Sequence, residues 1–172
     1  MGRTEFGGET TVVADAPTRN SLVYLWLSAA VIVLDQVTKQ MIVHSLALYQ
    51  SIVLLPVLEF TRLYNKGAAF SFLAGENGWQ RWLFTGLAVV VSVALILWLR
   101  RIERSAHTLA VAVALILGGA LGNLIDRVRL GQVIDFISTH WGEHYFPAFN
   151  VADSAICIGA GLLLLDAWLQ RR

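Results

Sequence analysis

Four long apolar runs limit what this chain can fold into. They cover residues 22–43, 82–99, 106–125 and 151–169. A helix needs about 20 mainly apolar residues to cross the hydrocarbon core of a bilayer, and each run is close to that length. Hydrophobic residues make up 56% of the chain and charged residues only 15%, whereas charged residues form about a quarter of an ordinary soluble domain. The sequence therefore predicts an all-α, multi-pass membrane protein whose four transmembrane helices form one domain, residues 21–172.

The first 20 residues differ from the rest of the chain. They are polar, rich in Gly and Thr, and contain no apolar run, so we expect a disordered cytoplasmic tail. No basic segment stands directly before the first apolar run, which argues against a cleaved signal peptide. We therefore expect the first run to be a retained helix.

Charge and cysteine content exclude several functions. The formal net charge is +1 and no basic tract is present, so we expect no nucleic-acid partner. The single cysteine, Cys157, lies between Ile156 and Ile158 and has no polar neighbour in the sequence to stabilise a thiolate. We expect Cys157 to fill space in a helix rather than to act as a nucleophile.

The arginines set the expected orientation. An even number of spans puts both termini on the same side as the short connection RRIER, residues 100–104. Cations in short loops are kept on the cytoplasmic side of a membrane. We therefore expect the RRIER segment and both termini to be cytoplasmic, and the two long loops to lie outside.

Polar residues of three spans then fall at one level. At about 1.5 Å per residue, Asp35 lies roughly 20 Å from the inner start of the first span, and Lys39 about 6 Å further out. The third and fourth spans carry polar residues at their outer ends, namely Asn123, Asp126, Asn150 and Asp153. Ionisable residues inside a membrane are functional by default, so this level is the candidate site.

Some of these residues also have a purely structural explanation. Asp35 and Lys39 are four residues apart and could neutralise each other on one helix face. Asn150 could cap the fourth span, with Asp153 favourably placed in its first turn. Asp166, near the inner end of the same span, is expected to have no special role.

The outer carboxyl groups suit acid–base chemistry. Hydrolysis of an amide without a metal or a nucleophilic side chain needs one carboxylate to activate water and one carboxylic acid to protonate the carbonyl oxygen. Asp126, Asp135 and Asp153 are the candidates, and their spacing does not choose between them. Arg127 directly follows Asp126, and an ion pair between them would keep Asp126 ionised, which makes it the poorest candidate.

Two other classes of protein fit part of this pattern. A proton-coupled transporter also buries ionisable residues, but it needs them deeper toward the cytoplasm than they occur here. A purely structural membrane subunit does not need polar residues from three helices at one level.

The long loops and the small residues carry further predictions. Residues 58–64 alternate apolar and polar side chains, which predicts a short strand followed by a turn at residues 64–67. Residues 67–72 are apolar enough to lie at the membrane surface, and the loop at residues 137–149 is rich in aromatic side chains. Close packing of the third and fourth spans is predicted by small residues at spacings of four, namely Gly118, Gly122, Ala155 and Gly159.

Five motifs in order resemble a known family. They are DQVTK at 35–39, NKGAAF at 65–70, GGALGNLIDR at 118–127, VIDF at 133–136 and FNVADS at 149–154. Together with four spans, this set resembles lipoprotein signal peptidase, also called signal peptidase II, over about residues 21–170. The resemblance implies an aspartyl endopeptidase of the bacterial inner membrane, with its site at the periplasmic face. It implies cleavage of prolipoproteins just before a diacylglyceryl-modified cysteine, without a metal or cofactor.

The resemblance also implies roles for individual residues. Asp135 and Asp153 become the catalytic pair. The polar residues around them become a supporting shell: Asp35, Lys39, Asn65, Asn123, Asp126, Arg127 and Asn150. The expected partners are lipid-modified prolipoproteins and membrane lipids, and the expected state is a monomer. A small β cradle and a surface helix are implied in the outer loops.

Overall fold

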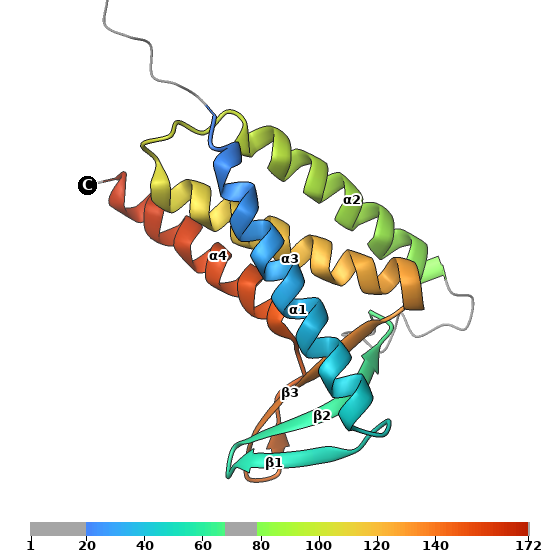
Figure 1. Ribbon diagram of the computed structural model, residues 1–172. Helices are drawn as coiled ribbons and strands as arrows, with labels where there is room; N and C mark the ends of the chain where they lie inside the picture. The colour runs from blue at the N-terminus through green and yellow to red at the C-terminus, as the bar shows by residue number, and fades with distance from the viewer. Residues whose placement is uncertain (1–19, 68–78, 172) are drawn as a thin grey trace, which may run out of the picture.

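A computed structural model describes residues 20–67 and 79–171 of the chain. Within them, four long helices run side by side (Figure 1). The bundle consists of a short 3-10 helix, η1 (Leu22–Tyr24), and the four helices α1 (Leu25–Ser45), α2 (Trp79–Leu99), α3 (His107–Leu130) and α4 (Val151–Leu169). All four α-helices are long and apolar enough to cross a membrane, as the sequence predicts. The expected N-terminal tail, apart from its last residue, lies outside the described residues.

The end of α3 differs from the prediction. The helix continues to Leu130 instead of ending at Ile125, so Asp126 lies inside it. It stops at Gly131, whose φ of 75° is left-handed and whose N–H donates to the carbonyl of Arg127 at 3.1 Å. Arg81 of α2 donates to the same carbonyl at 3.1 Å. These bonds satisfy carbonyl groups that the last turn of a helix leaves unpaired.

Small residues let α3 occupy the centre of the bundle, where it packs against each of the other three helices. A Cβ atom on Gly159 of α4 would lie 2.7 Å from the carbonyl oxygen of Ala112 in α3. Gly159 therefore packs between α4 and α3 as predicted. For Gly118 the prediction was wrong, because its position faces Val31 of α1, where an added Cβ would lie 2.8 Å from the Val31 Cβ. The tightest contact of α3 with α4 is at Gly119, where a Cβ would collide with the carbonyl of Ala152.

An antiparallel sheet lies at one end of the bundle, where α1 and α3 finish and α2 and α4 begin (Figure 1). We call this the sheet end. Its strands, in spatial order, are β1 (Ser51–Leu55), β2 (Leu58–Asn65), β3 (Val133–Trp141) and β4 (His144–Tyr145). The strand predicted at residues 58–64 is β2, and part of the segment expected to be a loop is β3. The sheet packs against the end of α1 through a cluster of Ile42, Leu46 and Phe136.

The surface helix is absent from the described parts of the two long loops. Residues 46–67 and 131–150 contain strands, turns and irregular backbone but no helix. Most of the segment at residues 67–72, which we expect at the membrane surface, lies outside the described residues.

Candidate active site

Polar side chains of α1, α3, α4, β2 and β3 meet at the sheet end. The structure brings together the residues that the sequence singles out: Asp35, Lys39, Asn65, Asn123, Asp126, Arg127, Asp135, Asn150 and Asp153. They come from five elements that extend from α1 to α4 along the chain. The site is therefore a product of the tertiary fold rather than of any one segment.

Lys39 forms the buried base of this group. Its side chain is fully buried, and its Nζ lies 2.8 Å from Asp35 Oδ2, 2.8 Å from Asp126 Oδ2 and 3.0 Å from Asn123 Oδ1. An ammonium group has three donors and no acceptor, so all of its hydrogen-bonding capacity is used. A buried charge without such partners costs several kcal/mol. Lys39 therefore joins α1 to α3.

Asp126 is held by several partners and differs from the expectation. Its ion-pair partner is Lys39 of α1 rather than the adjacent Arg127. The backbone N–H of Ile134 donates to its Oδ2 at 3.2 Å, and Gln36 Nε2 donates to its Oδ1 at 2.9 Å. Gln36 is not among the residues that the sequence predicts for the site, although a polar residue beside Asp35 in an apolar run is a usable signal. With these partners Asp126 is a structural carboxylate that connects α1, α3 and β3.

Asp35 reaches a third helix. The backbone N–H of Ala152, in the first turn of α4, donates to its Oδ1 at 2.9 Å. An added Cβ on Gly122 of α3 would lie 2.8 Å from Asp35 Oδ2 and 3.3 Å from the Ala152 Cβ. The missing side chain at Gly122 leaves room for this carboxylate between α3 and α4. Sequence patterns could not have identified a backbone donor 117 residues away.

Asn123 links the buried lysine to Asp153. Its Oδ1 accepts hydrogen bonds from Lys39 Nζ at 3.0 Å and from Asn150 Nδ2 at 3.1 Å. Both partners are donors there, so the oxygen of the amide must face them and its nitrogen must face away. That nitrogen donates to Asp153 Oδ1 at 2.7 Å. Lys39 thereby fixes the direction in which Asn123 presents a donor to Asp153.

Asn150 connects the two aspartates that the family resemblance makes catalytic. Its Nδ2 donates to Asp135 Oδ1 at 2.8 Å, and its backbone N–H donates to Asp153 Oδ2 at 3.2 Å. Its Oδ1 accepts from the backbone N–H of Asp153 at 2.9 Å, which completes a capping box at the start of α4. The capping explanation is therefore correct, and the same residue also donates to both carboxyl groups, to Asp135 through its side chain and to Asp153 through its backbone N–H. Asn65 of β2 donates to the remaining oxygen of Asp135 at 3.0 Å.

The environment of Asp135 favours its protonated form. The pKa of Asp135 is raised to about 6, mainly by burial and also by the nearby charge of Asp153, while the hydrogen bonds from Asn65 and Asn150 and the charge of Lys39 limit the rise. Only 3% of Asp135 is exposed to solvent. A carboxyl group with a pKa near neutrality can both hold and release a proton under physiological conditions.

The charges around the aspartates are unbalanced. Two cations, Lys39 and Arg127, face the carboxyl groups of Asp35, Asp126, Asp135 and Asp153. Arg127 Nη1 donates to the carbonyl of Asn123 at 3.4 Å, and its guanidinium carbon lies 5.7 Å from the centre of the Phe84 ring on α2. An excess of carboxylates in a buried site favours retention of a proton by one of them.

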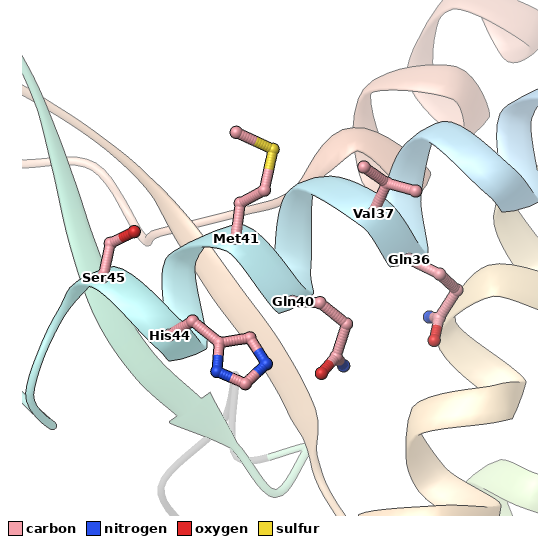
Figure 2. Close-up of a pocket in the computed structure, with 6 residues that line it drawn as sticks. All are labelled: Gln36, Val37, Gln40, Met41, His44 and Ser45. Carbon is pink, nitrogen blue, oxygen red and sulfur yellow. The ribbon is translucent and has the colours of Figure 1, made fainter.

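A hollow of about 530 Å³ lies on α1 beside this group. Figure 2 shows Gln36, Gln40 and His44 pointing to one side of the helix, with Val37 and Met41 pointing to another. Val37 and Met41 are at least half exposed. Because Gln36 also contacts Asp126, the hollow gives an apolar surface in direct continuity with the polar cluster.

Comparisons with known proteins agree on one family. A sequence profile of the family described as Signal peptidase (SPase) II matches residues 27–169. The lipoprotein signal peptidase of Pseudomonas putida is 56% identical over 153 residues, which cover 88% of this chain and 90% of that protein. The lipoprotein signal peptidase of Pseudomonas aeruginosa is 54% identical over 153 residues, covering 88% and 90%.

A solved structure described as a bacterial membrane enzyme shares the fold. It is 32% identical and matches with a TM-score of 0.77 over 90% of this chain and 93% of that chain. A second structure with the same description is also 32% identical and matches with a TM-score of 0.76, over 87% and 96%. The profile and the relatives span nearly the whole chain. This chain therefore belongs to the signal peptidase II family of membrane proteases, which remove signal peptides from lipoprotein precursors.

Proposed function

We propose that this chain is an aspartyl endopeptidase of the bacterial inner membrane, with Asp135 and Asp153 as its catalytic pair. Its substrate is a prolipoprotein whose cysteine carries a diacylglyceryl group, and the bond that it cleaves is the one just before that cysteine. The observation that carries the proposal is the position of Asn150, which donates to both carboxyl groups at once. The pKa of Asp135, raised to about 6 by burial, supports it.

The reaction follows from one proton shared by the pair. One carboxylate takes a proton from water as the water oxygen attacks the peptide carbonyl carbon, and the other aspartic acid gives its proton to the carbonyl oxygen. The aspartic acid that took the proton from water then gives it to the amine nitrogen as the carbon–nitrogen bond breaks, and the carbonyl re-forms as a hydroxyl of the intermediate gives its proton to the other aspartate. Because two coupled carboxyl groups titrate as a unit, neither Asp135 nor Asp153 is the permanent acid.

The surrounding residues keep this pair in place. Asn65, Asn123 and Asn150 orient the carboxyl groups by direct hydrogen bonds. Asp35, Lys39 and Asp126 form the ion-paired base beneath them, and Arg127 supplies a positive field. Catalytic groups work best when neighbouring side chains hold their rotamers. No metal or cofactor enters the scheme.

The membrane orientation follows from the arginines. Arg100, Arg101 and Arg104 lie in the short α2–α3 connection, at the end of the bundle opposite the sheet. By the positive-inside rule, that end is cytoplasmic and the sheet end is periplasmic. Hydrolysis would then occur where a signal peptide leaves the outer leaflet, while acyl chains stay in lipid. A monomer, a single domain over residues 21–172 and a surface helix in the outer loops stay predictions.

A transporter is the alternative that the core disfavours. The opposite half of the bundle is filled by a cluster of Leu95, Leu99, Ile102, Ala110, Val113 and Leu117. In the described part of the chain, this apolar packing leaves no row of ionisable side chains between the site and the other face. A proton path would need such groups.

Cleavage by purified protein tests the proposal. The enzyme in detergent is offered one precursor in two forms, with and without the diacylglyceryl group on its cysteine. We expect a product that begins at the lipidated cysteine and little product from the unmodified precursor. Ion flux in liposomes without any cleavage would instead support the transporter, and cleavage at another bond would refute the proposed specificity.

A further inference from the structure

The far end of the sheet carries an apolar surface that the catalytic scheme does not use. Two turns lie side by side there, one joining β1 to β2 and one joining β3 to β4. We call this region the sheet tip, and define it by Leu55, Val57, Trp141, His144, Tyr145 and Phe146. Trp141 is 81% exposed and Phe146 is 65% exposed. Large aromatic side chains grouped in this way on a surface mark a binding site for lipid or protein.

The sheet tip is held in one shape. The backbone N–H of His140 donates to the carbonyl of Val57 at 3.0 Å, which ties the two turns together. The backbone N–H of Phe146 donates to the carbonyl of Thr139 at 2.9 Å. The rings of His140 and Tyr145 stack with their centres 4.9 Å apart. The exposed aromatic side chains are therefore presented by ordered backbone.

The position of β3 puts the tip at the level of the helix ends. The strand begins just after α3 ends at Leu130, and its residue Ile137 pairs with Phe149, next to the cap of α4. The strands run across the helices instead of continuing them outward (Figure 1). From Asp135 to Trp141 the strand covers roughly 20 Å at about 3.3 Å per residue. The sheet therefore extends sideways from the site, along the membrane boundary that the helix ends define.

The tip also continues the surface that α1 presents to lipid. Met41 of α1 is 62% exposed, Tyr49 beyond the helix end is 75% exposed, and Val53 of β1 is 69% exposed. These residues lead from the helix to the first strand along consecutive segments of the chain. An apolar and aromatic surface that continues from a membrane-spanning helix at its end is suited to contact with lipid at the interface.

The composition of the tip indicates which lipid chemistry it contacts. Residues 52–60 and 137–148 contain no Lys or Arg, and their charged residues are Glu59 and Glu143. Tyr and Trp have an apolar ring and a polar edge, and they concentrate at the boundary between headgroups and acyl chains. This surface therefore suits the glycerol and upper acyl region of zwitterionic lipids, not anionic headgroups.

From these observations we infer that the sheet tip is an interfacial anchor inserted into the outer leaflet. The anchor fixes the sheet against the membrane plane, and β3 with it. Because β3 carries Asp135 and β2 carries Asn65, docking of the tip sets the height of the catalytic group above the lipid. This last consequence and the choice of the outer leaflet rest on the proposed function and orientation. Insertion of the tip into the membrane interface does not.

Spin labels test the insertion directly. In a Cys157→Ala background, single cysteines at positions 141 and 146 receive a nitroxide label, and the protein is placed in phosphatidylcholine liposomes. Val90→Cys, on the exposed face of α2, is the lipid control, and Ser105→Cys, in the exposed α2–α3 connection, is the aqueous control. Relaxation by oxygen and by a water-soluble nickel chelate gives the depth of each label. We expect both tip labels to lie between the two controls, and to stay at the same depth when anionic lipid or salt is added.

Two outcomes would overturn the inference. Tip labels as accessible to the nickel chelate as the label at position 105 would place the tip in water. Spin–spin broadening that grows with protein density would show that a second copy covers it.

A cleavage assay adds the functional consequence. The double variant Trp141→Ser/Phe146→Ser should keep wild-type turnover in detergent. In liposomes its turnover should fall roughly tenfold, because the two aromatic rings no longer anchor the tip in the interface. Equal loss in both conditions would contradict the anchoring role. Absence of cleavage by the wild-type enzyme would refute the proposed function but would leave the depth measurement valid.

Discussion

The fully buried ammonium group of Lys39 joins α1 to α3, and through Asn123 it also affects Asp153 of α4. Its contacts with Asp35 and Asp126 explain why the charge can be buried at all. Its contact with Asn123 explains why the amide nitrogen of that residue faces Asp153. The first effect concerns stability and the second concerns the site, so mutations can separate them.

Replacement of Lys39 by Met should show both effects. Lys39→Met leaves two carboxylates without their cation in a buried place, and loss of one partner of such a pair costs about 3–5 kcal/mol. We expect a large fall in the thermal midpoint in detergent. The variant Asp35→Asn/Lys39→Met/Asp126→Asn removes all the charges and should recover much of the midpoint. Its turnover should stay low because Asn123 is free to rotate. Full turnover in this triple variant would show that Lys39 contributes only stability.

Asp135 should destabilise the fold above pH 6. Its ordinary pKa is 3.8, and burial raises the folded-state pKa to about 6. Between these values the folded chain binds a proton that the unfolded chain does not, so the free energy of unfolding falls as pH rises through this window. The difference corresponds to at most about 3 kcal/mol, which is absent well below the unfolded pKa of 3.8, small at pH 4 and complete above about pH 7.

Asp135→Asn should therefore raise the thermal midpoint at pH 8 relative to the wild type, and should not raise it at pH 4. One of the two donors to Asp135 loses its acceptor in this variant, which costs about 1 kcal/mol and reduces the gain. Asp166→Asn, at the opposite end of α4, is the control and should leave the pH dependence unchanged. An Asp135→Asn midpoint that follows the wild type at every pH would contradict the raised pKa.

At the scale of the elements, α3 sets the spacing between the helices because its glycines lie at the close contacts with α1 and α4. Gly119 lies against the backbone of Ala152 in α4. The same two helices carry Asn123 and Asp153, whose side chains are 2.7 Å apart. Separation of α3 from α4 would therefore stretch a hydrogen bond of the site.

Gly119→Ala should cost both stability and turnover. The new methyl group collides with the carbonyl of Ala152, and overpacking of this kind typically costs about 1–3 kcal/mol. Gly161→Ala is the matched control in α4, because a Cβ there meets nothing within 4 Å. It should be neutral or slightly stabilising, since Ala favours a helix over Gly by about 1 kcal/mol. Equal behaviour of the two variants in thermal unfolding and cleavage would show that close approach at Gly119 is unimportant.

The helices were easier to predict from the sequence than the contacts between them. The rise along a helix is fixed, so Asp35, Asn123 and Asp153 could be assigned to one level from their positions alone. The rotation of each helix about its axis depends on packing, which the sequence does not reveal. The ion pair of Asp126 is therefore predicted with its neighbour Arg127, whereas the structure has it with Lys39. Residues 137–141 of β3 fall in the segment that is predicted as a loop, although VIDFISTHW is rich in β-branched and aromatic residues that favour strands. Its pairing with β2, which brings Asn65 to Asp135, depends on two loops that are distant in the chain.

For the whole molecule, the proposed orientation can be tested by reporters. A reporter that is active only in the periplasm should be silent when fused after Arg172 and active when inserted between Leu73 and Trp79. The reason is that, by the positive-inside rule, the three arginines of the short α2–α3 connection favour the cytoplasmic side for that end. The opposite pattern would place the sheet end in the cytoplasm and would remove the site from the side where signal peptides emerge.

Asp135 and Asp153 are proposed to act together on one water molecule. The most direct measurement is turnover of a lipidated precursor by purified Asp135→Asn, Asp153→Asn and the double variant, with Asp166→Asn as the control. A general acid or base typically contributes about 10²–10⁴-fold, and members of a coupled pair do not contribute additively. We expect each single variant to fold and to lose at least about 10²-fold in kcat, the double variant to be little worse than either, and Asp166→Asn to match the wild type. Near-native turnover in Asp135→Asn or in Asp153→Asn would contradict the assigned mechanism.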